Sequence, residues 1–197
     1  MRLTYALALF AAVSALTTVP ANAQGASLGN QITIKGGMFN PAKGAVKDVD
    51  KNWWVGGAEY AFGNLDAQAV NSLEVLYTTK SGTITPQGQL GIDSRYKVIS
   101  FALNHKIRNV PKGRAPLGNI LFYGAGIGFD YVDVKITDPN PGGEGSVSKK
   151  KAVGGANFFV GYDMAANFQI EAKYQLALGK VQDRDVSGLQ FLLGFKF

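Results

Sequence analysis

The chain has few residues of the types that carry out enzyme chemistry, and their spacing matches no catalytic motif. His105 is its only histidine, and there is no cysteine. Gly124, Gly126 and Gly128 are spaced like the start of a dinucleotide-binding loop, but Phe129 occupies the position where that motif needs its third glycine. The residues after Phe129 continue an extended pattern, whereas the motif needs a helix there. We therefore expect no enzyme activity, no cofactor and no metal site.

Charged residues instead alternate with apolar ones. Between Phe168 and Leu176 every second residue is apolar, and the residues between them are polar or charged. A period of two is typical of a β-strand with one apolar face. Applied along the chain, it assigns these charged residues to the other face: Lys35, Glu59, Glu74, Asp130, Asp163, Glu171, Lys173 and Lys196. Unpaired charges in an enclosed space are costly, so we expect a neutralising hydrogen-bonded network.

The elements that would position these side chains are eight strands. The alternation occupies residues 31–39, 53–62, 70–79, 95–107, 120–134, 152–163, 167–178 and 186–197. Long polar gaps at 40–52, 80–94, 135–151 and 179–185 alternate with short gaps at 63–69 and 164–166. The gap at 108–119 is long where a short one is expected. Long loops on one side and short turns on the other are typical of a barrel in an outer membrane.

The start of the chain predicts export. Arg2 precedes an apolar run from Tyr5 to Val13, and Ala21-Asn22-Ala23 is a cleavage signal. We expect residues 1–23 to be a signal peptide and residues 24–197 to form one barrel domain. Beyond the signal no apolar run reaches the length of a membrane helix. With no cysteine available, packing and hydrogen bonds must stabilise the exported protein.

The predicted fold class is all-β, a closed up-and-down antiparallel transmembrane β-barrel of about eight strands. Closure is expected because lipid offers no hydrogen-bond partners, so each backbone group must pair with a neighbouring strand. Two sequence stretches, Leu121 to Phe129 and Gly161 to Tyr174, and the final Phe197 resemble the small eight-stranded, porin-like outer-membrane barrel family of Gram-negative bacteria.

That resemblance implies an outer-membrane location, with lipid and lipopolysaccharide around the barrel. It also implies that the outer-membrane assembly machinery recognises the strand ending at Phe197. The implied role is structural, in envelope integrity or in surface interaction, with a narrow porin-like channel as a second possibility. We expect no nucleic acid partner. The sequence does not define an oligomeric state.

A short basic segment is the candidate binding surface. Lys149, Lys150 and Lys151 are adjacent and fall in the predicted loop 135–151. Such a loop would contact the phosphates of lipopolysaccharide or an acidic host surface by charge attraction.

A different class of function remains as an alternative: a soluble periplasmic barrel that carries a small apolar ligand, as lipocalins do. Such a carrier would place apolar side chains inside and polar ones outside. The bare glycines at 124, 126 and 128 and the final Phe197 favour the membrane barrel instead.

Overall fold

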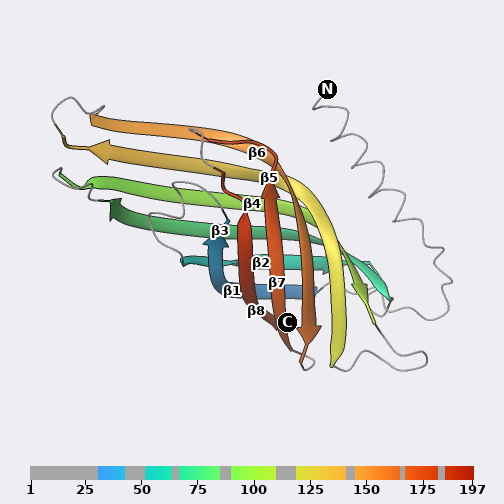
Figure 1. The fold of residues 1–197 in the computed structure, drawn as a ribbon. Helices are drawn as coiled ribbons and strands as arrows, with labels where there is room; N and C mark the ends of the chain where they lie inside the picture. Colours follow the sequence, from blue (N-terminus) through green and yellow to red (C-terminus); the bar gives the residue numbers. More distant parts are fainter. Residues whose placement is uncertain are drawn as a thin grey trace.

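The chain forms one closed antiparallel barrel in which each strand pairs with the next and β8 pairs with β1 (Figure 1). The computed structural model describes residues 31–42, 52–63, 67–84, 90–109, 119–140, 145–164, 167–181 and 185–197. Its strands are β1 (Gln31–Pro41), β2 (Trp53–Phe62), β3 (Ala69–Ile84), β4 (Ile92–Arg108), β5 (Ile120–Asp138), β6 (Gly145–Asp163), β7 (Phe168–Ala177) and β8 (Gly188–Lys196). The predicted all-β, eight-stranded up-and-down barrel is confirmed.

Backbone hydrogen bonding continues around the whole circumference. Ile34 of β1 lies opposite Ala58 of β2 on one side and opposite Phe195 of β8 on the other. No helix in the described ranges is long and apolar enough to cross a membrane. The predicted signal peptide and most of the gap at 108–119 lie outside the described residues.

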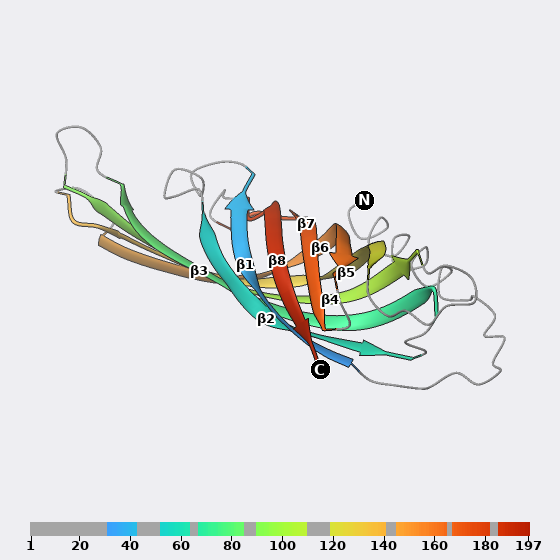
Figure 2. The same ribbon diagram turned by 90° about the horizontal axis from the view of Figure 1, so that it is seen from below.

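Four neighbouring strands are much longer than the other four. β3, β4, β5 and β6 continue as a sheet that extends away from the barrel on one side (Figures 1 and 2). We call this part, residues 79–84, 92–98, 132–138 and 145–152, the projecting sheet. The hairpin ends of β3–β4 and β5–β6 are joined where Leu90 N–H donates to Asn140 Oδ1 at 2.7 Å.

The projecting sheet corrects the predicted strand ends. The gaps expected at 80–94 and 135–151 are largely strand, since β3 continues to Ile84, β4 begins at Ile92, and β5 and β6 reach Asp138 and Gly145. Direct backbone pairing holds these extensions together, for example Gly82 with Ser94 and Ile136 with Val147. The long polar segments are therefore paired strands with short connections.

Candidate functional site

A cluster of six charged side chains fills the middle of the barrel lumen. At its centre Lys35 Nζ lies 2.5 Å from Glu59 Oε2, 2.7 Å from Glu74 Oε2 and 2.9 Å from Glu171 Oε2. The Lys35 side chain is only 1% exposed. One ammonium thus contacts three carboxylates that come from three different strands, β2, β3 and β7.

Two further lysines complete the cluster. Lys106 Nζ lies 3.0 Å from Glu59 Oε1, and Lys173 Nζ contacts Glu74 Oε1 and lies 3.0 Å from Glu171 Oε1. Three lysines face three glutamates, so the cluster carries no net charge when all are ionised. We call Lys35, Glu59, Glu74, Lys106, Glu171 and Lys173 the ion network. Aromatic rings pack against it, with Lys106 Nζ 4.7 Å from the Phe122 ring centroid and Lys173 Nζ 5.3 Å from that of Phe159.

Neighbouring glycines make room for these long side chains. Lys35 lies opposite Gly57 on β2 and Gly194 on β8. On β5, a Cβ added to Gly124 would lie 2.5 Å from Cζ of Phe159, so the ring occupies the space that a side chain would need. The missing side chain at Gly124 therefore leaves interior room for the larger Phe159 ring.

The structure separates the eight predicted charged residues into three groups. Lys35, Glu59, Glu74, Glu171 and Lys173 join the ion network, together with Lys106, which the sequence analysis did not include. Lys196 pairs with Asp163, with Nζ 2.5 Å from Oδ1. Asp130 forms no ion pair within the described residues and instead accepts a hydrogen bond from Gln175 Nε2.

The three adjacent lysines lie in a strand, so their predicted placement in a loop is wrong, whereas their predicted binding to a surface ligand stays a prediction. Lys149, Lys150 and Lys151 lie within β6, opposite Val134, Asp133 and Val132 of β5. Side chains alternate between the two faces of a strand, so Lys150 points away from the other two. Lys150 Nζ lies 3.9 Å from Asp133 Oδ2, whereas Lys151 Nζ donates to the Lys180 carbonyl at 3.1 Å.

An apolar cluster closes the end of the lumen next to the projecting sheet, which itself contributes Tyr96, Val98, Val132 and Val134. Trp53 and Tyr96 pack with ring centroids 5.2 Å apart, and Phe39 packs edge-on against Trp53 at 5.6 Å. The other members of this buried cluster are Val55, Leu76, Val98, Val132, Val134, Val153, Val181, Val186 and Leu192. Such dense packing does not support an open channel through the described part of the barrel.

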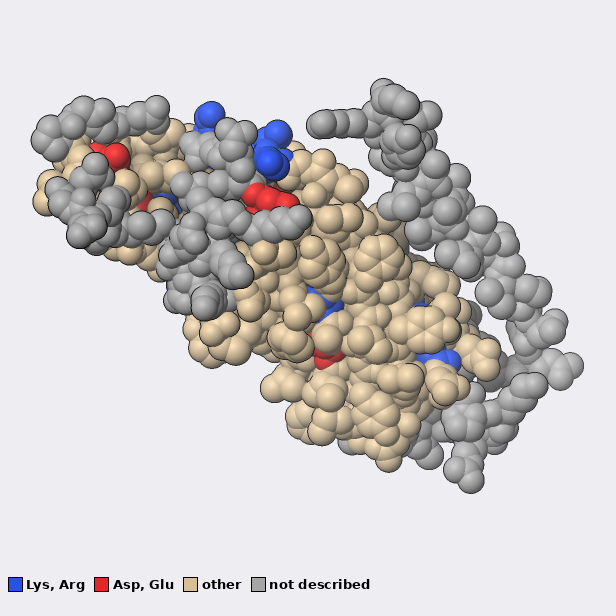
Figure 3. Space-filling view, viewed as in Figure 1, with Lys and Arg blue, Asp and Glu red and all other residues tan. Residues whose placement is uncertain are grey.

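The outer wall of the barrel is apolar. The exposed residues include Ile34, Leu73, Phe129, Phe158, Ile170 and Leu193. Most of the wall seen in Figure 3 is uncharged, and charged groups gather near the projecting sheet. An apolar exterior around a charged lumen is the reverse of what a lipocalin-like carrier needs, so the structure does not favour that alternative.

Two residues singled out by the sequence lie toward the short-turn end. His105 is paired with Asn71 of β3, its Nδ1 2.8 Å from Asn71 Oδ1. Within the described residues, no three His, Cys, Asp or Glu side chains lie close enough to hold a metal ion. Phe197 donates its backbone N–H to the Ile32 carbonyl at 2.8 Å, and its ring packs edge-on against Phe195 at 4.8 Å.

Comparison with known proteins identifies the fold and no close relative. Neither a protein family nor a curated protein matches the sequence. Among solved structures, the attachment invasion locus protein Ail of Yersinia pestis aligns with a TM-score of 0.54 and 18% identity, over 87% of this chain and 100% of Ail. Neisserial surface protein A aligns with a TM-score of 0.51 and 12% identity, over 88% of this chain and 97% of that protein. The chain therefore shares the fold of small eight-stranded outer-membrane barrels.

Proposed function

We propose that this chain is an integral outer-membrane protein whose barrel anchors the projecting sheet at the cell surface. The observation that carries the proposal is the apolar outer wall around a charged, filled lumen. A contiguous apolar surface of this size marks contact with a membrane or with another protein. In lipid, the charged groups must face inward and pair with one another, as the ion network does.

The height of the apolar wall supports a bilayer. On β5 the outward apolar residues run from Leu121 to Tyr131, and the next outward residue is Asp133. Ten steps of about 3.3 Å along a strand tilted by about 40° span about 25 Å along the barrel axis. The apolar band of outer-membrane barrels is about 25 Å tall.

The filled lumen supports a structural or surface-interaction role over transport. The apolar cluster around Trp53 and Tyr96 lies across one end of the lumen. The cavity beside the ion network has a volume of about 20 Å³, which holds one or two water molecules. A solute would have to displace these packed side chains to cross.

Fractionation of cells that express the chain tests the membrane proposal. The chain should sediment with the outer membrane, resist extraction with carbonate, and migrate differently in detergent electrophoresis before and after heating. An amine-reactive reagent that does not cross membranes should label Lys135 and Lys150 on intact cells. Recovery in the soluble periplasmic fraction with no heat-dependent shift would refute the proposal.

The outer face of the projecting sheet supports a second proposal, contact with the phosphates of lipopolysaccharide. Arg95 of β4 lies directly opposite Lys135 of β5, and both are exposed. Two like charges in register destabilise a sheet unless an anion lies between them. Ser81 and Ser148 flank the pair in register, and they add hydroxyl donors. Lys135 is the second residue after Tyr131 on the outer face of β5. Arg95 and Lys135 therefore lie just beyond the apolar band, at the level expected for headgroup phosphates. Ail, which shares this fold, is known in complex with the heparin analogue sucrose octasulfate.

The double variant Arg95→Ser/Lys135→Ser tests this contact. Each basic residue near an anionic surface contributes about 1 kcal/mol, so binding to lipopolysaccharide in nanodiscs should weaken about 30-fold. The matched control is Lys149→Ser/Lys151→Ser, which removes two lysines from the opposite face of the sheet. Equal binding by the wild type and the Arg95/Lys135 variant would refute the contact.

We also propose that Phe197 is the recognition signal for assembly. The residue is 71% exposed, so the folded barrel buries little of it and should need it little for stability. The variant Phe197→Ser should reduce the amount of assembled barrel in cells but leave refolding in detergent unchanged. Equal amounts of assembled protein in cells would contradict the proposal.

A further inference from the structure

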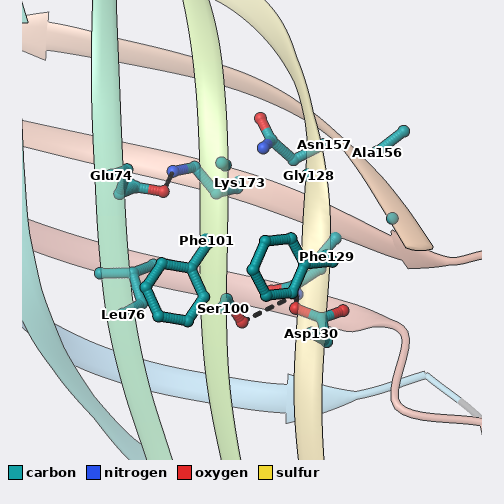
Figure 4. Close-up of a pocket in the computed structure, with 13 residues that line it drawn as sticks. Glu74, Leu76, Ser100, Phe101, Gly128, Phe129, Asp130, Ala156, Asn157 and Lys173 are labelled. Atoms are coloured by element: carbon teal, nitrogen blue, oxygen red, sulfur yellow. Dashed lines mark hydrogen bonds and ion pairs between the residues drawn. The ribbon is translucent and has the colours of Figure 1, made fainter. Parts of the chain in front are cut away.

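We propose that a small cavity in the lumen binds one small monovalent cation, with the Asp130 carboxylate as its charged ligand. The cavity lies against β4, β5 and β6 beside the ion network. Figure 4 shows Ser100 and Asp130 toward one end of it and the Glu74–Lys173 pair toward the other. This inference concerns the lumen alone and does not depend on a membrane location or a surface ligand.

The cavity exists because three small residues lie side by side across the sheet. Ala102 of β4 is opposite Gly128 of β5, which is opposite Gly155 of β6, and all three line the cavity. Its volume of about 20 Å³ suits an ion with one water molecule, since one water needs about 10–15 Å³.

Asp130 points a free carboxylate oxygen toward this space. The residue is 2% exposed. Its Oδ1 accepts a hydrogen bond from Gln175 Nε2, whereas Oδ2 has no hydrogen-bond partner within the described residues. A Cβ added to Gly155 would lie 3.4 Å from Oδ2, so this oxygen faces the row of small residues. A buried carboxylate oxygen without a donor or a cation is costly, and an ion beside it would remove that cost.

The charges around the cavity call for a single positive charge. Lys173 lines the same cavity but contacts Glu74 and Glu171, and Lys196 is paired with Asp163. Asp130 therefore has no cationic partner among these ion pairs, and Arg108, the remaining basic residue on this face of β4, lies at the far end of the strand, where its Nη2 donates to the Ala67 carbonyl. The Ser100 hydroxyl also lines the cavity; its oxygen accepts a hydrogen bond from Gln175 Nε2 at 3.0 Å and has a second lone pair to offer as a neutral ligand. Hard cations prefer such oxygen ligands, and one carboxylate suits a monovalent ion better than Ca²⁺, which takes six to eight oxygens.

Thermal unfolding in two salts tests the site. The chain is refolded in detergent micelles in sodium chloride or in choline chloride of equal ionic strength, because choline is too large for the cavity. The Tm of the wild type should be about 4 °C higher in sodium when Na⁺ is in tenfold excess over its dissociation constant. Asp130→Asn should abolish that difference. The control Asp133→Asn removes an acidic residue from the projecting sheet and should retain the full difference.

Gly155→Ala provides a second variant that keeps the carboxylate but narrows the cavity. It should also lose the sodium dependence, and electrophoresis of unheated samples would show that it is folded. Crystals grown with Tl⁺ in place of Na⁺ should show an anomalous peak beside Asp130 Oδ2. A wild-type Tm that is equal in the two salts, or an Asp130→Asn variant that keeps the sodium dependence, would overturn the proposal. If the wild-type Tm is equal in the two salts and the Tm of Asp130→Asn is the same as that of the wild type, Asp130 is protonated and the proposal is also overturned.

Discussion

The barrel wall and the projecting sheet are made of the same strands but have opposite polarity. On the barrel part of β5, the outward residues Ile127 and Phe129 are apolar, and Asp130 faces the lumen. Farther along the same strand, the outward residues are Asp133 and Lys135, and Val132 and Val134 are buried on the inner side. The pleat makes side chains alternate regularly between the two faces along the whole strand. The reversal therefore comes from the residue types at these positions and not from a change in side-chain direction.

The exchange of polarity indicates where the surroundings of the barrel change. It occurs at one level on neighbouring strands. Tyr77, Ile99 and Tyr131 are in register across β3, β4 and β5. The next residues on the same face toward the projecting sheet are Thr79, Lys97 and Asp133, which are also in register. In the proposed membrane location, the outer face contacts lipid below this level, where the charges turn inward. Above this level the outer face contacts water, and the apolar residues of β5 pack on the inner side of the sheet. The same strands thus present an apolar outer face on the barrel and a polar outer face on the projecting sheet.

The ion network should be the most sensitive part of this arrangement. Lys35→Met leaves three buried carboxylates that share the two remaining lysines, and removal of one partner from a buried ion pair costs about 3–5 kcal/mol. Unfolding in urea, followed by tryptophan fluorescence, to which buried Trp53 and exposed Trp54 both contribute, should show that loss of stability or a failure to refold.

A double variant sharpens this first prediction. Lys35→Met/Glu171→Gln restores the charge balance, so it should recover part of the lost stability, and the coupling can be measured in a double-mutant cycle. Additive losses would show that Lys35 stabilises the barrel by packing rather than by its charge.

Arginine substitutions along the outer face of β5 should locate the exchange of polarity. Ile127→Arg places a charge near the middle of the apolar band and should cost about 2–4 kcal/mol in phospholipid vesicles, whereas Asp133→Arg should cost about 0–1 kcal/mol. Both unfolding free energies are measured in the same vesicles. A similar cost at the two positions would mean that lipid reaches Asp133 and that the level of the exchange is misplaced.

The sequence predicted the barrel well but missed the projecting sheet, and the polarity exchange explains both. The residues Phe168 to Leu176 keep one apolar face throughout, so the period of two defines β7 closely. On β5 the apolar residues move to the other face beyond Tyr131, so a search for one continuous apolar face ends near there. The lysines at 149–151 resemble a loop in the sequence because both faces of β6 are exposed there, so polar residues follow one another without alternation.

The alternation predicted which charged residues face the lumen better than it predicted which of them form ion pairs. Lys106 shares the face of Ser100 and Asn104 on β4, so the same alternation could have placed it in the lumen. The pairing itself could not be derived, because Lys35 on β1 meets Glu171 on β7 over Gly194 of the intervening strand β8 rather than within one strand pair. Contacts of that kind depend on barrel closure and strand tilt, which a local pattern does not contain.

The smallest effect is expected for a lysine of the projecting sheet. Like Lys35, Lys150 lies near a carboxylate, but its side chain is 60% exposed and its Nζ is 3.9 Å from Asp133 Oδ2. Lys150→Met should change the unfolding free energy by less than about 0.5 kcal/mol, because solvent screens exposed ion pairs and side-chain entropy opposes them. The same urea titration that reports on Lys35→Met measures this difference. A loss above about 1 kcal/mol would show that charges on the projecting sheet also stabilise the fold. The barrel lumen and the projecting sheet would then differ only in how much their ion pairs contribute to stability.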